Sequence, residues 1–305
     1  MINKQRVLDE FLELIQIRCS TRQEREIGDL LTARLTALGG TVREDNAGQK
    51  LGGNCGNLVA DFPGTLPEAP TVMLTAHMDC VEPCGDIHPI RENGIIRSDG
   101  TTILGSDDKA GVTAILETLR QLQENAIPHG PLQVVFTIAE ENGVHGSQNM
   151  DSSLLHADLG YTLDTHGHLG NMSYKEQGQN QIHIQVQGRA AHAGVEPEKG
   201  LNAIQIAGRL LGDAPQGRID EETTCHVGRI CGGGATNVVA DICDVYYESR
   251  SRDKAKLERI TTEIIEHFRA GGEAAGCKVT AEVSPDYGPY SLATDSLAIH
   301  VASPA

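Results

Sequence analysis

The chain has 305 residues, 39% hydrophobic and 22% charged, a composition typical of globular proteins rather than of disordered or fibrous ones. Its formal net charge of −17 disfavours binding to nucleic acid or to an anionic membrane surface, because like charges repel. No stretch approaches the roughly 20 consecutive apolar residues of a membrane span. The charged start MINKQRVLDEFLELI is not typical of a secretory signal, so we expect a cytoplasmic protein.

The eight cysteines are expected to be reduced, because a cytoplasmic location does not favour disulfides. Cys80 and Cys84 have the spacing of half a zinc site, but no second pair has a matching local spacing. We therefore favour free thiols at these two positions.

The first half of the chain alternates helices with apolar strands. A helix is predicted at about 4–18. Thr21 with Glu24 resembles a capping box that opens a second helix, which runs to about Leu38. A helix is also predicted from Asp107 to about Glu124, and a small hairpin or loop at 87–104. Strands are predicted at 57–62, 71–79, 131–141 and about 158–164. This alternation predicts an α/β fold with a mostly parallel sheet that helices cover on both faces.

The pattern changes near Gly178, where QIHIQVQG alternates apolar and polar residues like a half-buried strand. A helix at about 200–213, strands at 223–230 and about 241–249, a helix at about 253–270 and a strand at 277–284 follow. The order β-α-β-β-α-β predicts a ferredoxin-like α+β module. We therefore predict a first domain at 1–177, an inserted domain at 178–288, and the start of a return to the first domain at 289–305.

Acidic residues and a histidine gather at the predicted strand ends of the first domain. In open α/β sheets, ligands bind outside the carboxyl ends of the strands. Five side chains therefore converge on one edge, with a sixth just before a helix: His77, Asp79, Glu140, Glu141 and Asp164, and Asp107. Each has an ordinary explanation when it is taken singly, such as a helix N-cap for Asp107 or a turn for Asp164. Together they favour a metal site.

The residue types in this group suit hydrolytic metal chemistry. His77 offers an imidazole nitrogen, and Asp79 is placed to fix its tautomer from the same side of the strand. Nitrogen and carboxylate ligands suit Zn²⁺, Co²⁺ or Mn²⁺, and a pair of cations would hold several mutually repelling carboxylates. If Glu141 binds metal, Glu140 stays free to act as a general base on a water molecule.

Four motifs, TAHMDCVEP, DGTTILGSDDKAGV, FTIAEENGVHGS and YTLDTHG, resemble in sequence and order the dinuclear zinc exopeptidase family of peptidase T and carboxypeptidase G, nearest to its peptidase T branch. The resemblance implies two zinc ions per chain on a zinc-exopeptidase sheet. It implies His77 and Asp164 as ligands of one metal, Asp107 as the bridging ligand, and Glu141 as a ligand of the other. It further implies that Glu140 is the general base and that Asp79 supports catalysis.

The second domain resembles the lid of that family, which also forms its dimer. GRAAHAGVEPEKGLNA implies that His192 reaches substrate in the partner's active site. GGGATNVVAD implies that Asn237 contacts substrate, and ESRSRD implies that Arg250, or Arg252 as the fallback, binds a substrate carboxylate. Taken without the family, His192 has the features of a surface residue, and both arginines could simply end a strand in solvent.

The family resemblance also implies a last segment that returns to the catalytic sheet and supplies a His ligand to the second metal. Only residues 291–305 follow Tyr290 here, and His300 lies too early to match that ligand. We therefore expect the second metal site to be one protein ligand short.

Together these observations predict a metal-dependent exopeptidase on short peptides, specifically an aminopeptidase on tripeptide-like substrates that works as a homodimer. Two alternatives remain open from the residues. One is an amidase or deacylase on N-acyl amino acids, and the other is a truncated relative that binds or dimerises without catalysis.

Overall fold

A computed structural model of the chain describes residues 2–165 and 167–303, and it divides the chain into two compact units. Unit 1 comprises Met1–Met172 with His300–Ala305, and unit 2 comprises Ser173–Ile299. The predicted boundaries, after residues 177 and 288, both fall inside unit 2. The reason is a small two-stranded sheet in which β8 (Lys175–Glu176) pairs with β14 (Tyr290–Ser291) and keeps both flanking stretches with that unit.

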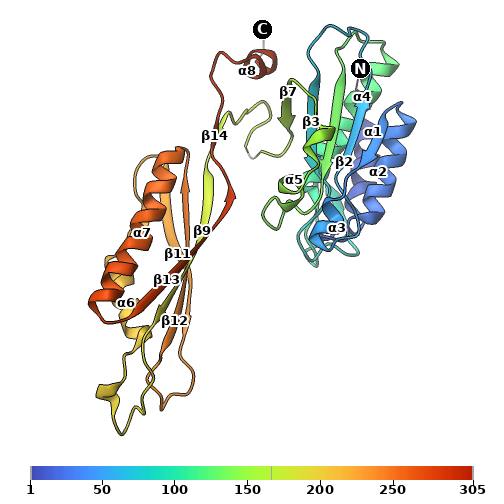
Figure 1. Cartoon of the computed structure of the whole chain (residues 1–305). Helices are drawn as coiled ribbons and strands as arrows, with labels where there is room; N and C mark the ends of the chain where they lie inside the picture. The colour runs from blue at the N-terminus through green and yellow to red at the C-terminus, as the bar shows by residue number, and fades with distance from the viewer. Residues whose placement is uncertain (1, 166, 304–305) are drawn as a thin grey trace. The chain divides into compact units, whose positions relative to one another are not determined.

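Unit 1 is built on a five-stranded sheet with the order β1-β2-β6-β3-β7 (Figure 1). These strands are β1 (Thr41–Glu44), β2 (Leu58–Phe62), β6 (Leu132–Thr137), β3 (Val72–His77) and β7 (Leu159–Thr162). β3 pairs in parallel with β6 and β7, whereas β1 and β2 are added antiparallel. The α/β class is confirmed, and the sheet is mixed. Its parallel part, β6-β3-β7, carries the predicted site.

Three helices of unit 1 lie along one face of this sheet (Figure 1). They are α1 (Lys4–Ile15), α2 (Arg25–Ala37) and α4 (Ser106–Glu124). Their apolar sides close a core of fully buried residues that includes Leu14, Leu31, Ile115, Val134 and Phe136. Shorter elements complete the unit: α3 (Ala47–Leu51), the hairpin of β4 (Ile90–Glu92) and β5 (Ile95–Arg97), α5 (His145–Gln148) and the 3₁₀ turn Ser152–Leu154.

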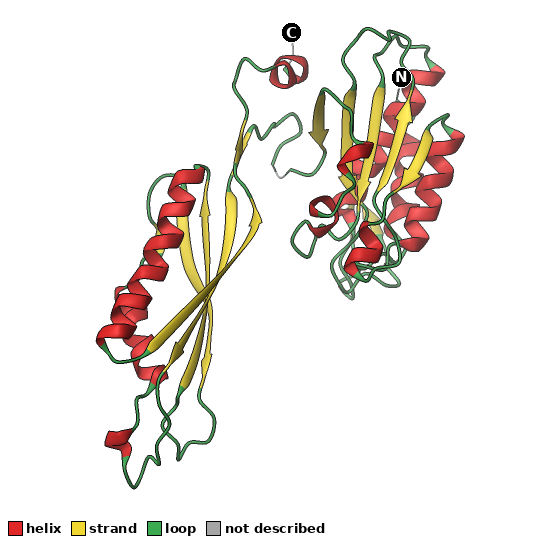
Figure 2. Cartoon of the chain, viewed as in Figure 1, coloured by secondary structure: helices red, strands yellow, loops and turns green. Residues whose placement is uncertain are grey.

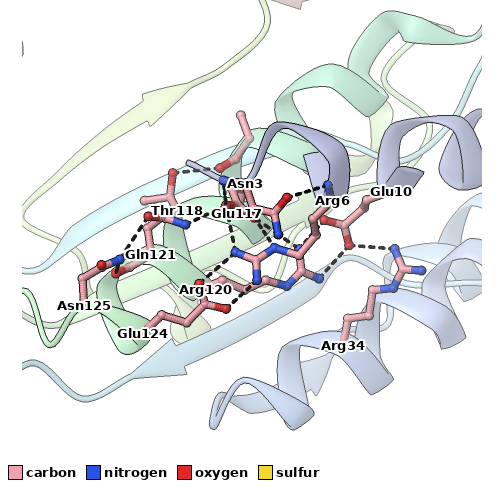
Figure 3. A network of polar contacts seen from close by, with 11 residues as sticks. Asn3, Arg6, Glu10, Arg34, Glu117, Thr118, Arg120, Gln121, Glu124 and Asn125 are labelled. Carbon is pink, nitrogen blue, oxygen red and sulfur yellow. Dashed lines mark hydrogen bonds and ion pairs between the residues drawn. The ribbon is translucent and has the colours of Figure 1, made fainter. Parts of the chain in front are cut away.

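A network of charged side chains ties α1 to α4 and α2 (Figure 3). Arg6 donates from Nε and Nη2 to the two carboxylate oxygens of Glu117, each at 2.8 Å. Glu10, which is 6% exposed, accepts hydrogen bonds from Arg34 of α2 and Arg120 of α4. Bidentate arginine–carboxylate pairs fix geometry as well as charge. The network therefore holds α4, the helix that starts beside the predicted site, against its neighbours.

Unit 2 has a five-stranded antiparallel sheet with the order β10-β11-β12-β9-β13. The strands are β10 (Gly217–Arg218), β11 (Thr223–Gly232), β12 (Ile242–Ser251), β9 (Gly178–Gln187) and β13 (Lys278–Tyr287). α6 (Ala203–Asp213) and α7 (Lys254–Ala274) cover one face (Figure 2) and bury Ile184, Val245 and Phe268 between sheet and helices. The order β11-β12-β9-β13, with the module's first strand between its third and fourth, is the predicted ferredoxin-like arrangement.

The remaining elements are short. A 3₁₀ turn spans Pro197–Lys199, and α8 spans Leu297–Ala302. Among the described residues, no helix is both long enough and apolar enough to cross a membrane.

Candidate metal centre

The carboxyl ends of the parallel strands in unit 1 bring together the side chains that the sequence singles out. His77 ends β3, Glu140 and Glu141 follow β6, and Asp164 follows β7. Asp107 lies at the start of α4, where its φ and ψ of −84° and 112° are not helical. One ligand atom each from His77, Asp107 and Glu141 lies within 4.8 Å of the others, and the same holds for His77, Glu140 and Asp164. Both groups therefore share His77.

The ring of His77 is 2% exposed and held from behind by Asp79. Its Nδ1 lies 3.1 Å from the main-chain oxygen of Asp79 and 3.4 Å from the carboxylate Oδ1 of the same residue. This leaves Nε2 facing the acidic cluster, 3.1 Å from Asp107 Oδ1 and 4.0 Å from Asp164 Oδ2. Burial lowers the pKa of His77, but Asp79 and Asp107 outweigh burial and raise that pKa to about 10. The ring nitrogen that faces the cluster therefore sits where a cation is electrostatically favoured.

The carboxylates of the cluster repel one another. Burial is the largest cause that raises the pKa of Glu140, and repulsion from Asp164 and Glu141 raises it further. Burial and nearby Asp107 likewise raise the pKa of Glu141 and of Asp164. Crowded carboxylates with raised pKa values are typical of functional sites. A divalent cation would relieve this repulsion, and the imidazole and carboxylate donor set suits Zn²⁺, Co²⁺ or Mn²⁺. The residues present therefore fit a metal centre.

Asp79 supports more than the histidine. Its Oδ1 accepts the main-chain N–H of Glu140 at 2.9 Å, and its Oδ2 accepts the N–H of Glu141 at 3.3 Å and the hydroxyl of Thr21 at 2.7 Å. One fully buried carboxylate thus joins the end of β3 to the turn after β6. This coupling between His77 and the Glu140–Glu141 pair is not visible in the sequence.

The predicted capping box of Thr21 and Glu24 is wrong. The N-cap of α2 is Glu24 itself, and its side chain makes no capping hydrogen bond. The Thr21 hydroxyl instead binds Asp79, and Glu24 Oε1 accepts the N–H groups of Arg22 at 2.8 Å and Ala139 at 3.1 Å. A Thr-x-x-Glu spacing predicts a local cap, but here Thr21 binds Asp79, and Glu24 binds Ala139 as well as the nearby Arg22.

Sequence reasoning also assigned no role to the two residues that follow Asp107. Asp108 is 4% exposed, its Oδ1 accepts the N–H of Gly111 at 3.0 Å, and burial and then Asp164 raise its pKa to about 7. Lys109 is fully buried, and its Nζ donates to the main-chain oxygens of Met78 at 2.6 Å and Asp79 at 3.3 Å. A charged Asp-Asp-Lys run normally indicates a solvated helix start, so only the three-dimensional structure reveals this burial.

The lid residues fall into two places within unit 2. His192 and Asn237 are neighbours. Ala193 N donates to Asn237 O at 2.9 Å, and His192 forms an isolated antiparallel β-bridge with Val238. Both side chains belong to exposed residues. Arg250 lies near the far end of β12, where its Nε donates to Glu248 at 2.6 Å. A ten-residue strand is about 33 Å long, so unit 2 does not bring Arg250 to the other two residues.

Two family descriptions match the chain. Residues 57–201, which include the whole cluster, match "Peptidase family M28". Residues 174–275 match "Peptidase dimerisation domain". The second match lies within unit 2, whereas the first spans the strand ends that carry the cluster.

Relatives of this chain extend over most of its length. It is 38% identical over 305 residues to the uncharacterized protein YqjE of Bacillus subtilis, covering all of this chain and 82% of that protein. It is 27% identical over 251 residues to peptidase T of Shigella boydii, covering 72% of this chain and 61% of that protein. The chain therefore spans less than two thirds of the length of this peptidase T.

Two solved structures show the same fold at 38% identity. A tripeptidase from Staphylococcus aureus superposes with a TM-score of 0.95 at 38% identity, covering 99% of this chain and 81% of that one. The aminopeptidase PepT from Bacillus cereus gives a TM-score of 0.93 at 38% identity, covering 98% of this chain and 80% of that one. The chain is therefore a metallopeptidase, a hydrolase, and belongs to the dinuclear zinc exopeptidase family of peptidase T and carboxypeptidase G.

Proposed function

We propose that this chain is an aminopeptidase that removes the N-terminal residue of tripeptide-like substrates with the help of bound zinc. The observation that carries the proposal is the placement of Glu140, a carboxylate that lies beside the His77 and Asp164 ligand atoms while its neighbour Glu141 joins the other group. The substrate class is supported by the tripeptidase and the aminopeptidase at 38% identity.

His77, Asp107, Glu141 and Asp164 would hold the metal. Bound cations of this kind polarise a carbonyl group and make water a nucleophile near neutral pH. Co²⁺ and Mn²⁺ suit the same nitrogen and oxygen donors as Zn²⁺. Asp79 contributes by holding Nδ1 of His77, which keeps Nε2 free for the metal.

Glu140 would act as the proton carrier. Its raised pKa, caused first by burial, brings the carboxyl closer to the range in which it can both accept and return a proton. It takes a proton from the attacking water and then gives it to the nitrogen of the leaving amine. The main-chain N–H of Glu140, held by Asp79, keeps this carboxylate beside the cluster.

The lid would supply substrate contacts from two copies of the chain. His192 and Asn237 lie at one end of the lid sheet and Arg250 towards the other, so one copy would present only part of the set to a given site. A homodimer, which the peptidase dimerisation domain supports, would let the partner contribute His192 to stabilise the developing oxyanion. Arg250 would bind the substrate carboxylate, and Asn237 would contact the peptide.

The test is a Glu140→Gln variant assayed with zinc on tripeptides, dipeptides and N-acetyl amino acids. We expect wild-type turnover to be fastest on tripeptides, and the variant to lose about 10²- to 10⁴-fold in kcat, the usual contribution of a general acid–base group. Glu68 is an exposed carboxylate outside the cluster. Glu68→Gln is therefore the control and should keep wild-type activity. Preferential hydrolysis of N-acetyl amino acids would replace the proposal with a deacylase. Full activity of Glu140→Gln would remove Glu140 from the mechanism.

A further inference from the structure

In the turn that carries Glu140 and Glu141, side-chain oxygens accept the main-chain N–H groups, while the carbonyl oxygens of Ala139 and Glu140 accept from the main chain of residues 143–145. After β6 ends at Thr137, four successive main-chain N–H groups donate to side-chain oxygens. Ile138 N donates to Asn57 at 3.0 Å, Ala139 N to Glu24 at 3.1 Å, and the N–H groups of Glu140 and Glu141 to Asp79. The strand ladder therefore gives way to side-chain acceptors from the residue before β2, from the N-cap of α2 and from the segment just after β3.

Among these acceptors, Glu24 is the one whose burial is hardest to explain by local structure. It is 0% exposed, and its Oε2 has no hydrogen-bond partner among the described residues. Burying a carboxyl group is costly unless its interactions compensate. The side chain does not cap α2, so its two accepted N–H groups, from Arg22 and Ala139, are the contacts that this burial serves.

Ala139 has the unusual backbone conformation that turns the chain before Glu140. It has a positive φ of 48°, which is uncommon for a residue other than glycine, and it is fully buried. The peptide between Ala139 and Glu140 sets the direction in which the Glu140 side chain leaves the backbone. A left-handed alanine persists only when its surroundings hold it, and Glu24 supplies the hydrogen bond to its N–H.

Burial raises the pKa of Glu24, and the nearby Asp79 adds to that rise. A neutral carboxyl group at this position still offers Oε1 as an acceptor. A glutamine has the same length and the same acceptor without a titratable proton, whereas an aspartate keeps the carboxyl group but is one methylene shorter. Replacing Glu24 by Gln therefore removes only the titratable carboxyl group, replacing it by Asp shortens the side chain, and replacing it by Ala removes the acceptor.

We propose that Glu24 is a positioning residue for peptide hydrolysis, which fixes the left-handed turn at Ala139 so that Glu140 points into the metal cluster and Glu141 reaches its ligand position. The proposal rests on the function proposed above, because it assigns Glu24 a role through Glu140. It also extends the candidate site to the segment before α2, where Thr21 holds Asp79 in the same way.

The experiment compares Glu24→Gln, Glu24→Asp and Glu24→Ala in the full chain loaded with zinc. Hydrogen exchange of the peptide covering residues 138–142 is measured together with kcat and KM on a tripeptide. We expect Glu24→Ala and Glu24→Asp to lose protection in this peptide and about 10²-fold in kcat, as for a catalytic group displaced by about 1 Å, with KM nearly unchanged. Glu24→Gln should retain wild-type protection in this peptide and most of the wild-type kcat.

Leu35→Ala is the matched control, because it removes a fully buried side chain at the other end of α2. It should lower the melting temperature but leave exchange at 138–142 and kcat unchanged. Wild-type kcat and protection in folded Glu24→Ala and Glu24→Asp would overturn the proposal, as would a Glu24→Gln variant as impaired as Glu24→Ala. If the wild type hydrolyses no peptide, the proposed function fails, and the exchange data alone still decide whether Glu24 holds the turn.

Discussion

At the scale of single residues, the structure shows how far strand-end positions can be interpreted. The sequence was enough to predict that several side chains meet at one end of the sheet, because parallel strands end there. These are His77, Glu140, Glu141 and Asp164, together with Asp107, which precedes a helix. Glu24 was not predictable, because its acceptor role depends on Ala139, which lies 115 residues further along the chain. A Thr-x-x-Glu motif predicts hydrogen bonds to the nearby helix N-terminus. It does not indicate when the same side chains will bind residues distant in the sequence instead.

Lys109 leads to a prediction about stability. Its buried ammonium donates to the main-chain oxygens of Met78 and Asp79, directly after the strand that carries His77. Lys109→Met leaves these buried acceptors without their donor, so we expect the free energy of unfolding to fall by about 2 kcal/mol, measured by urea denaturation. Lys50, an exposed lysine that donates to Asn149 O at 3.1 Å, provides the control. Lys50→Met should change stability by less than about 0.5 kcal/mol. Equal losses in the two variants would contradict this account.

At the scale of elements, the long periodic segments were predictable, and so were the hairpin of β4 and β5 and the short strand β7, but several other short elements were not. The helices α1, α2, α4, α6 and α7 and the strands β2, β3, β6, β9 and β12 all match predicted segments. The four-residue strand β1, the five-residue helix α3 and the two-residue strands β8 and β14 have too few residues for a periodic pattern. The β8-β14 pairing also decides where unit 2 ends, so the boundary of that unit was beyond the reach of the sequence pattern.

The ion-pair network between α1 and α4 predicts a pH dependence of stability. The hydrogen bond from Arg6, the largest cause, holds the pKa of Glu117 below its usual value of 4.5. A carboxyl group whose pKa is lower in the folded state than in the unfolded state contributes stability above the unfolded pKa. That stability is lost as the pH falls below 4.5 through the folded pKa.

Glu117→Gln removes this contribution. We expect it to lower the free energy of unfolding by about 1–2 kcal/mol at pH 7, the range for hydrogen bonds to charged groups in a partly exposed setting. The difference from wild type should shrink as the pH falls to 3, measured by urea denaturation at each pH. Glu124→Gln alters the exposed partner of Arg6 and should have little effect. A difference that stays constant from pH 7 to pH 3 would exclude the ion pair as its source.

At the scale of the whole molecule, the chain combines a unit that carries the candidate metal centre with a unit that matches a peptidase dimerisation domain. The ferredoxin-like order of unit 2 was predictable, because its strands and helices alternate clearly. The assembly of two copies stays a prediction, because it depends on contacts between chains. The cytoplasmic location also stays a prediction.

The dimer prediction can be checked by light scattering. We expect the purified chain to have about twice the 32.6 kDa mass of one copy at micromolar concentration. His192→Ala should keep that mass but reduce kcat, because the residue would act in the partner's site and is exposed within its own unit. A monomer with full peptidase activity would contradict the proposed contribution of the partner.

The cluster at the carboxyl ends of β3, β6 and β7 is expected to bind metal. The most direct measurement is the zinc content per chain after stripping, reconstitution and removal of excess metal, for the wild type and for His77→Ala. Because His77 belongs to both ligand groups, we predict at least one tightly held zinc ion per wild-type chain and its loss in the variant. Wild-type chain that retains no more zinc than His77→Ala would contradict the account.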